Sequence, residues 1–261
     1  MLSRRAALAG LTTVALAPSA LAQPAKPLLP AGMRAAVSLT YDDGVDSQLD
    51  HAVPALDALG LKATFFLTEE NMEERLADWA KVAREGHEVA DHTVSHPCKL
   101  QGYSAASFGR REIRPMEAFL DTNFGAERVH TFAYPCGLEG LGAGAVAARR
   151  ARYLRALRGE IVAARTVEGP PNALSAIGRN RFGLNGFEPT YDLDAALPAI
   201  RYVHRAMAMG GWAILVFHRV LPRRLEEGDT SIAVHQQILS WLAAAPVWCA
   251  PMGQVFRQLT A

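Results

Sequence analysis

The sequence lacks an excess of charge of either sign, and it contains few cysteines. Its 261 residues include 27 Lys and Arg against 26 Asp and Glu, with no run of like charge. This balance argues against a nucleic-acid-binding protein, which usually carries a concentrated basic face. Three cysteines are too few for a disulfide-stapled miniprotein, and a chain that is half hydrophobic is neither disordered nor a coiled coil. We therefore expect one domain with a large core and a function that resides in a pocket.

The N-terminus has the three-part layout of a secretory signal peptide. A short basic start is followed by an uncharged apolar stretch over residues 6–21 and by an A-x-A cleavage site that ends at Ala22. The pair Arg4-Arg5 is also typical of a twin-arginine export signal, and an ordinary signal with two arginines accounts for it equally well. We expect residues 1–22 to be removed and residues 23–32 to form a linker. The mature protein would then be periplasmic or secreted, without a transmembrane segment.

From residue 35 onward, short apolar runs alternate with helix-length segments. The run Trp212–Phe217 is continuously apolar, as a parallel strand covered on both faces requires. The chain lacks an internal repeat, and no phosphate-binding glycine motif follows the first strand, so the pattern favours an α/β barrel over a dinucleotide-binding open sheet. The strands are expected at residues 35–39, 62–67, 87–90, 129–133, 153–157 and 212–217, and the helices at residues 48–59, 71–84, 104–120, 142–152, 194–209 and 232–245.

Two adjacent carboxylates, Asp42 and Asp43, end the first predicted strand and precede Gly44. Because side chains alternate on a strand, both acids face one pocket only if the backbone bends, which Gly44 permits. Two carboxylates this close repel each other unless a cation or a proton separates their roles. A metal ion held by one would leave the other ionised and available as a base. A plain Asp-Asp-Gly turn accounts for these residues about equally well.

A second polar cluster follows the third predicted strand. His92 and His96 lie four positions apart, a spacing that puts both imidazoles on one face of a helical turn. Two His and one Asp form a three-ligand set with a position left for water, which is typical of a catalytic divalent-metal site. Zinc is the leading candidate, with cobalt, nickel or manganese as alternatives. Asp91 either orients a histidine or starts a turn.

The most apolar predicted strand ends at His218. Catalytic groups gather at the carboxyl-terminal rim of a parallel barrel, so this imidazole is a candidate general acid. The remaining five histidines are expected to be structural or to lie at the surface: His51, His87, His130, His204 and His235.

The ordered combination of residues 39–44, 92–96 and 215–218 resembles the motifs of the NodB-like polysaccharide deacetylase domain of the family-four carbohydrate esterases. The resemblance extends over residues 33–261 and implies a distorted (β/α) barrel of about seven strands. It also implies a metal-dependent hydrolase that removes acetyl groups from an N-acetylated glycan. The roles it implies are those of catalytic base for Asp42, of general acid for His218, and of metal ligands for Asp43, His92 and His96.

The chain departs from this family in its third and fourth motifs. The third usually reads Arg-x-Pro-aromatic, whereas residues 133–137 read Ala-Tyr-Pro-Cys-Gly. We expect Tyr134, Pro135 and Cys136 to contribute to substrate binding or to the oxyanion site, the latter through the Cys136 amide. Arg155 or Arg158 either supplies the missing positive charge or is solvated. No Asp-Trp pair matches the fourth motif, so the wall of the acetyl pocket is unassigned.

The cysteines and the reaction class leave alternatives open. Cys98 and Cys136 either form a disulfide across the pocket rim or stay unpaired like Cys249, which is expected in the core. The leading function is N-deacetylation of a chitin-, peptidoglycan- or poly-N-acetylglucosamine-like substrate. The alternatives are an O-acetyl esterase acting on xylan or a similar glycan, and a catalytically weak sugar-binding protein.

Overall fold

The computed structural model describes residues 28–261. The predicted signal peptide and the first half of the predicted linker, residues 23–27, lie outside these residues. None of the helices in residues 28–261 combines the length and the apolar character needed to span a bilayer.

The core of the fold is a curled sheet of seven parallel strands in the order β5-β4-β3-β2-β1-β6, with β9 also paired to β1. This arrangement confirms the predicted distorted (β/α) barrel of about seven strands. The strands of this sheet are β1 (Ala35–Asp43), β2 (Thr64–Leu67), β3 (Glu88–Asp91), β4 (Thr131–Ala133), β5 (Ala163–Arg165), β6 (Trp212–Phe217) and β9 (Val247–Cys249). A separate two-stranded sheet consists of β7 (Val220–Leu221) and β8 (Thr230–Ser231).

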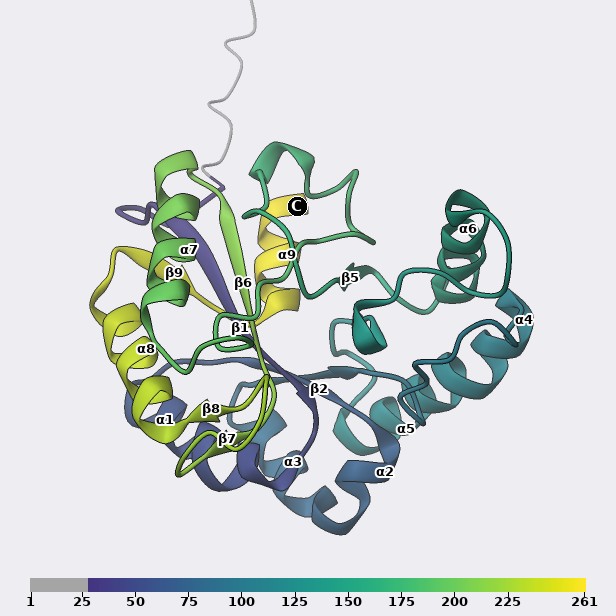
Figure 1. Ribbon diagram of the computed structural model, residues 1–261, viewed down its shortest axis with the longest axis horizontal. Coiled ribbons are helices and arrows are strands. Elements are labelled where there is room, and N and C mark those ends of the chain that lie inside the picture. Colours follow the sequence, from purple (N-terminus) through teal and green to yellow (C-terminus); the bar gives the residue numbers. More distant parts are fainter. Residues whose placement is uncertain (1–27) are drawn as a thin grey trace, which may run out of the picture.

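Helices surround the sheet on its outer face, with α7 and α8 beside β6 and β1 and with α4, α5 and α6 on the opposite side (Figure 1). Two π-helical turns, Gln48–Ala52 and Gly109–Ile113, precede α1 and α5 respectively. The α-helices are α1 (Val53–Ala58), α2 (Glu69–Met72), α3 (Leu76–Arg84), α4 (Ala105–Phe108), α5 (Arg114–Phe124), α6 (Val146–Leu157), α7 (Leu197–Met209), α8 (Ile232–Ala244) and α9 (Met252–Thr260), and three-residue 3-10 turns lie at Glu73–Arg75, Pro135–Gly137 and Leu174–Ala176.

An irregular segment, residues 184–187, lies between β5 and β6. Leu184 donates its backbone amide to Ala164 of β5, and Phe187 exchanges backbone hydrogen bonds with Ile214 and Val216 of β6. These bonds connect the two outer strands of the sheet. The next residue along the chain, Glu188, therefore lies close to the carboxyl end of β6.

β1 lies at the centre of the sheet and is buried along its length up to Asp42. The Tyr41 hydroxyl shares a 2.7 Å hydrogen bond with Nε2 of the buried His235, a structural contact of the kind expected for that histidine. Because β1, β2, β3 and β6 run parallel, their carboxyl ends meet at one edge of the sheet. Polar residues that directly follow these strands are therefore brought together.

The predicted elements differ from the observed ones at residues 153–157 and after residue 245. Residues 153–157, expected as a strand, are the last turns of α6. The actual strand, β5, is only three residues long and reads Ala-Ala-Arg, without the β-branched or aromatic residues that signal a strand. Likewise, β9 and α9 follow the last predicted helix and were not expected.

Candidate functional site

The two aspartates at the end of β1 face one site because the backbone bends at both Asp43 and Gly44. Their φ angles are 79° and 72°, respectively, in the left-handed region that Gly adopts freely and Asp tolerates. The bend predicted at Gly44 is therefore present, and it begins one residue earlier, at Asp43. Thr68 and Asn71 donate side-chain hydrogen bonds of 3.1 and 3.0 Å to the Asp43 carbonyl, which fixes the turn.

Three potential metal ligands converge beside this turn. The Asp43 Oδ1 atom lies 3.5 Å from Nε2 of His92 and 3.5 Å from Nε2 of His96. One donor atom from each of these three residues lies within 4.8 Å of the other two. Two imidazole nitrogens and one carboxylate oxygen, with an open side toward the cavity, are a donor set that suits a divalent cation such as Zn²⁺.

The segment that carries the two histidines is an irregular loop, so the expected helical turn is wrong. Thr93 and His96 have φ angles of 72° and 49°, which no helix contains. The Thr93 amide donates to Asp91 Oδ1 at 2.6 Å, and the His96 amide donates to Thr93 Oγ1 at 3.0 Å. Asp91 therefore starts a turn, one of its two expected roles. This turn still brings the imidazole rings together, with their centroids 4.8 Å apart.

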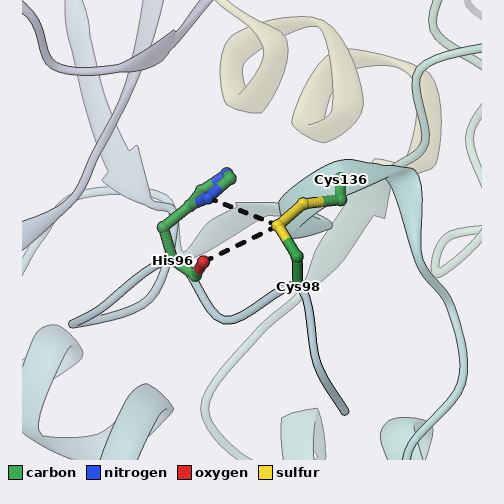
Figure 2. A group of neighbouring side chains, drawn as sticks. All are labelled: His96, Cys98 and Cys136. Carbon is green, nitrogen blue, oxygen red and sulfur yellow. Dashed lines mark hydrogen bonds between the residues drawn. A yellow bond between two sulfur atoms is a disulfide. The ribbon is translucent and has the colours of Figure 1, made fainter.

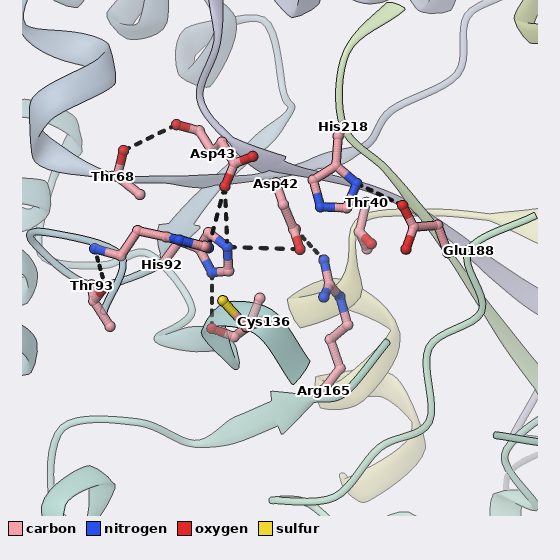
Figure 3. Close-up of polar contacts among 12 residues, drawn as sticks. Thr40, Asp42, Asp43, Thr68, His92, Thr93, Cys136, Arg165, Glu188 and His218 are labelled. Carbon is pink, nitrogen blue, oxygen red and sulfur yellow. Dashed lines mark hydrogen bonds and ion pairs between the residues drawn. The ribbon is translucent and has the colours of Figure 1, made fainter. Parts of the chain in front are cut away.

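Electrostatics favour the ligand forms of these side chains. The buried His92 ring shares a 2.9 Å hydrogen bond between Nδ1 and the Ala133 carbonyl, so Nδ1 carries the proton and Nε2 faces Asp43 (Figure 3). Burial alone would raise the pKa of Asp43, but the hydrogen bond and charge of His92 and the charges of His218 and His96 hold it well below its usual range. Burial and the charge of His92 lower the pKa of His96, which favours its neutral, metal-binding form.

Asp42 forms a buried ion pair with Arg165, a residue that the sequence analysis did not identify. The Arg165 Nη2 donates to Asp42 Oδ1, and its guanidinium lies 4.8 Å from the centre of the Phe66 ring. Arg165 comes from the end of β5 and points toward Asp42 (Figure 3), and it is fully buried. Arg155 and Arg158, the two candidates for this charge, are both exposed on or after α6. Of the two alternatives for these arginines, the structure supports the solvated one.

His218 forms a second acid–base pair, with Glu188. The His218 Nδ1 lies 2.9 Å from Glu188 Oε1 (Figure 3). Burial lowers the pKa of His218, but the pairing with Glu188 and the charges of Asp42, Glu188 and Asp43 outweigh this effect and raise the pKa to about 9. No sequence signal pointed to Glu188, because it lies in a stretch without regular secondary structure.

Gln48 connects Asp42 at the end of β1 with His218 at the end of β6. Its side-chain amide donates to the carbonyls of Asp42, at 2.5 Å, and of His218, at 3.2 Å. Gln48 is fully buried and lies on the π-helical turn Gln48–Ala52. It therefore couples the carboxyl ends of β1 and β6.

These residues open into a cavity of about 810 Å³. Tyr134 and Cys136, two of the three residues predicted to bind substrate or an oxyanion, lie in its lining, and the residues that line it do not include Pro135. The Tyr134 hydroxyl donates to the Phe182 carbonyl at 2.9 Å, which directs it into the protein. Cys136 lies on the 3-10 turn that follows β4, with a φ angle of 54°.

Cys136 is joined to Cys98 by a disulfide at the rim of the cavity (Figure 2). The two Cα atoms are 5.8 Å apart, within the usual range for a disulfide. The bond ties the loop of His96 to the turn after β4, which is the paired alternative of the sequence analysis. Cys249 is a free, partly buried thiol.

Comparisons with known proteins agree with this geometry. Residues 31–151 match the family model described as polysaccharide deacetylase. A peptidoglycan-N-acetylglucosamine deacetylase of Bacillus cereus is 45% identical over 67 residues, which are 24% of this chain and 24% of that protein. The chain therefore matches about a quarter of the length of this curated relative.

Solved structures share the fold over most of the chain. A Mycobacterium smegmatis protein described as a polysaccharide deacetylase has a TM-score of 0.64 at 17% identity, covering 88% of this chain and 92% of that one. A carbohydrate esterase domain of a multidomain xylanase, from the hindgut metagenome of Trinervitermes trinervoides, has a TM-score of 0.59 at 18% identity, covering 87% and 92%. At these identities the likeness establishes a common barrel fold.

Proposed function

We propose that this chain, whose residues 31–151 match the family model described as polysaccharide deacetylase, is a metal-dependent hydrolase that removes N-acetyl groups from an amino-sugar polymer or oligomer. The reaction consumes water and releases acetate and a free sugar amine. The observation that supports it most directly is the position of Asp42 and its partner Arg165 beside the donor set of Asp43, His92 and His96.

Asp43, His92 and His96 are the proposed metal ligands, and this set of nitrogen and oxygen donors suits zinc, with cobalt, nickel or manganese as alternatives. When bound, the divalent cation acts as a Lewis acid toward the acetyl carbonyl and lowers the pKa of water at the site. The Nδ1 hydrogen bond of His92 to the Ala133 carbonyl fixes the ring so that Nε2 is presented to the cation.

Asp42 is the proposed general base. It accepts a proton through its carboxylate as water attacks the acetyl carbon. Arg165 contacts Oδ1 of Asp42, so the guanidinium holds the carboxylate in one orientation, while Oδ2 remains on the side of His92. Arg165 supplies the positive charge that the third motif of the family carries at the position of Ala133 in this chain.

His218 is the proposed general acid. A pKa of about 9 keeps its imidazole protonated at neutral pH, with Glu188 holding the charge through Nδ1. The opposite nitrogen is then free to donate a proton to the departing amine, which is a very poor leaving group without it. We assign the Cys136 backbone amide, at the cavity wall, to the developing oxyanion.

The protonated His218 supports an amide substrate over an ester. An alkoxide needs less help from an acid than an amine does, so an O-acetyl esterase on xylan would depend less on a partly buried His-Glu pair. The curated relative is named for a substrate with N-acetylglucosamine, which agrees with this choice. The signal-like N-terminus further supports export of the protein to a periplasmic or extracellular glycan.

Acetate release from defined glycans tests this proposal. The protein is stripped with a chelator, reloaded with Zn²⁺, and incubated with N-acetylglucosamine oligomers, peptidoglycan or acetylxylan. We expect acetate from an N-acetylated glycan only after reloading. Release from acetylxylan alone would support the esterase instead, and no release from any substrate by a metal-loaded protein would support a sugar-binding role.

A further inference from the structure

The two histidines of the proposed metal site are held very differently. His92 is buried, with 1% of its side chain exposed, and its ring is anchored by the Ala133 carbonyl. His96 is 34% exposed at the side chain. Within residues 28–261, its Nδ1 contacts only the Cys98 Sγ, at 3.8 Å (Figure 2). The position of the His96 imidazole therefore depends mainly on the backbone of its loop.

That loop has no regular secondary structure between β3 and Ser104. Besides the Cys98–Cys136 disulfide, Glu112 holds this loop at Val94 and Ser95. The Glu112 carboxylate accepts hydrogen bonds from the Ser95 amide, at 3.1 Å, and from the Ser95 hydroxyl, at 3.1 Å. The Glu112 carbonyl accepts from the Val94 amide at 3.3 Å. Glu112 thus contacts Val94 and Ser95, the two residues that directly precede His96.

Glu112 is itself firmly placed. Only 4% of the residue is exposed, and Tyr103, farther along the same loop region, donates its hydroxyl to Oε1 at 2.8 Å. The residue lies on the π-helical turn Gly109–Ile113, a kind of turn that is often found at functional sites. A buried carboxylate that receives three hydrogen bonds is costly to replace, because an amide in its place directs a donor at a donor.

We propose that Glu112 is a positioning residue of the metal site, which holds the Val94–Ser95 backbone so that the His96 imidazole reaches the cation. This role rests on the proposed function, because it requires a metal bound by His96. Glu112 itself contacts neither the cation nor the substrate. Its loss would loosen one ligand of three and leave Asp43 and His92 in place.

The test titrates the chelator-treated protein with Co²⁺ and determines the Co²⁺ affinity from the visible absorption of the bound ion. Glu112→Gln is compared with Glu88→Gln, a matched control at the opposite end of β3. The Glu88 carboxylate also accepts three hydrogen bonds, from Thr64, Thr131 and the Gly253 amide. We expect Glu112→Gln to weaken Co²⁺ binding about tenfold, as loss of an outer-shell partner does, and Glu88→Gln to leave it unchanged.

A double-mutant cycle shows whether the effect passes through His96. In a His96→Ala background, we expect Glu112→Gln to change Co²⁺ affinity less than twofold. Should Glu112→Gln fail to fold, Ser95→Ala replaces it: this exposed residue loses its hydroxyl contact, and we expect a smaller loss of affinity that also vanishes without His96.

Three results would overturn the role of Glu112. They are wild-type affinity in Glu112→Gln, an equal loss of affinity in the His96→Ala background, and an equal loss in Glu88→Gln. A wild-type chain that binds no Co²⁺ would overturn the metal site and this role together. A wild-type chain that binds Co²⁺ but releases no acetate would contradict the proposed reaction alone.

Discussion

The ion pair between Arg165 and Asp42 allows a quantitative prediction for Arg165→Met. Methionine fills a similar volume and removes the charge, so the Asp42 carboxylate is left buried without its partner. Both side chains are at most 2% exposed. Among the described residues, the Nε and Nη1 atoms of Arg165 have no hydrogen-bond partner, so this guanidinium is not placed for optimal stability.

The size of the effect follows from the burial of the pair. Removing one partner of a buried ion pair typically costs about 3–5 kcal/mol. We expect the lower end of this range, because the substitution also removes the Nε and Nη1 donors of Arg165, which have no hydrogen-bond partner among the described residues. For a domain of this size, about 3 kcal/mol corresponds to a decrease in Tm of about 6–12 °C. Deacetylation should fall at least about 100-fold, the usual contribution of a general base.

Thermal unfolding in the presence of a chelator, together with acetate release, checks both values. Adding Asp42→Asn to Arg165→Met removes the unpaired charge, so the double variant should unfold at a higher temperature than Arg165→Met and remain inactive. The reasoning would be refuted if Arg165→Met unfolded within 2 °C of the wild type, or if the second substitution lowered the Tm further.

Three further predictions concern other contacts of the site. His218 acts as an acid below its pKa of about 9 and loses this role above it. Because Glu188 raises this pKa, Glu188→Gln should move the alkaline limb of the pH profile of kcat/KM from about 9 toward 6.5. An alkaline limb that does not move would exclude the pairing of His218 with Glu188. The Cys98–Cys136 bond joins positions 38 apart, so the Cys98→Ser/Cys136→Ser variant should lose about 4 kcal/mol of stability. Alkylation at pH 8 should label no cysteine before reduction and two after it, since burial raises the pKa of Cys249 to about 12; three labelled thiols without reductant would disprove the disulfide. Gln48→Met should lower kcat about tenfold with unchanged Co²⁺ affinity, because Gln48 joins the carbonyls of Asp42 and His218, and an unchanged kcat would show that this link is dispensable.

The parts of the site that follow apolar strands could be predicted from the sequence. Asp42 and Asp43 end β1, and His218 directly follows β6. Burial of such strands leaves little choice for their polar ends, which must open on a pocket or on solvent. For the same reason, the alternation of apolar strands with helices predicted a parallel α/β fold.

The contacts between distant segments could not be predicted. Asp42 and Arg165 are 123 positions apart, and β5 is too short and too rich in alanine to indicate a strand. Glu188 reaches His218 only because residues 184–187 bridge β5 and β6 by irregular hydrogen bonds. The spacing of His92 and His96 indicated convergence but suggested a helix, because the left-handed Thr93 and His96 leave no trace in the pattern of residue types.

Asp42→Asn provides the most direct measurement, with metal content and acetate release determined on the same sample beside the wild type. The substitution leaves Asp43, His92 and His96 intact and removes the proposed base. We predict one equivalent of bound Zn²⁺ in both proteins, with acetate released from N-acetylglucosamine oligomers by the wild type alone. Near-normal acetate release by Asp42→Asn would contradict the assignment of the base and, with it, the proposed mechanism.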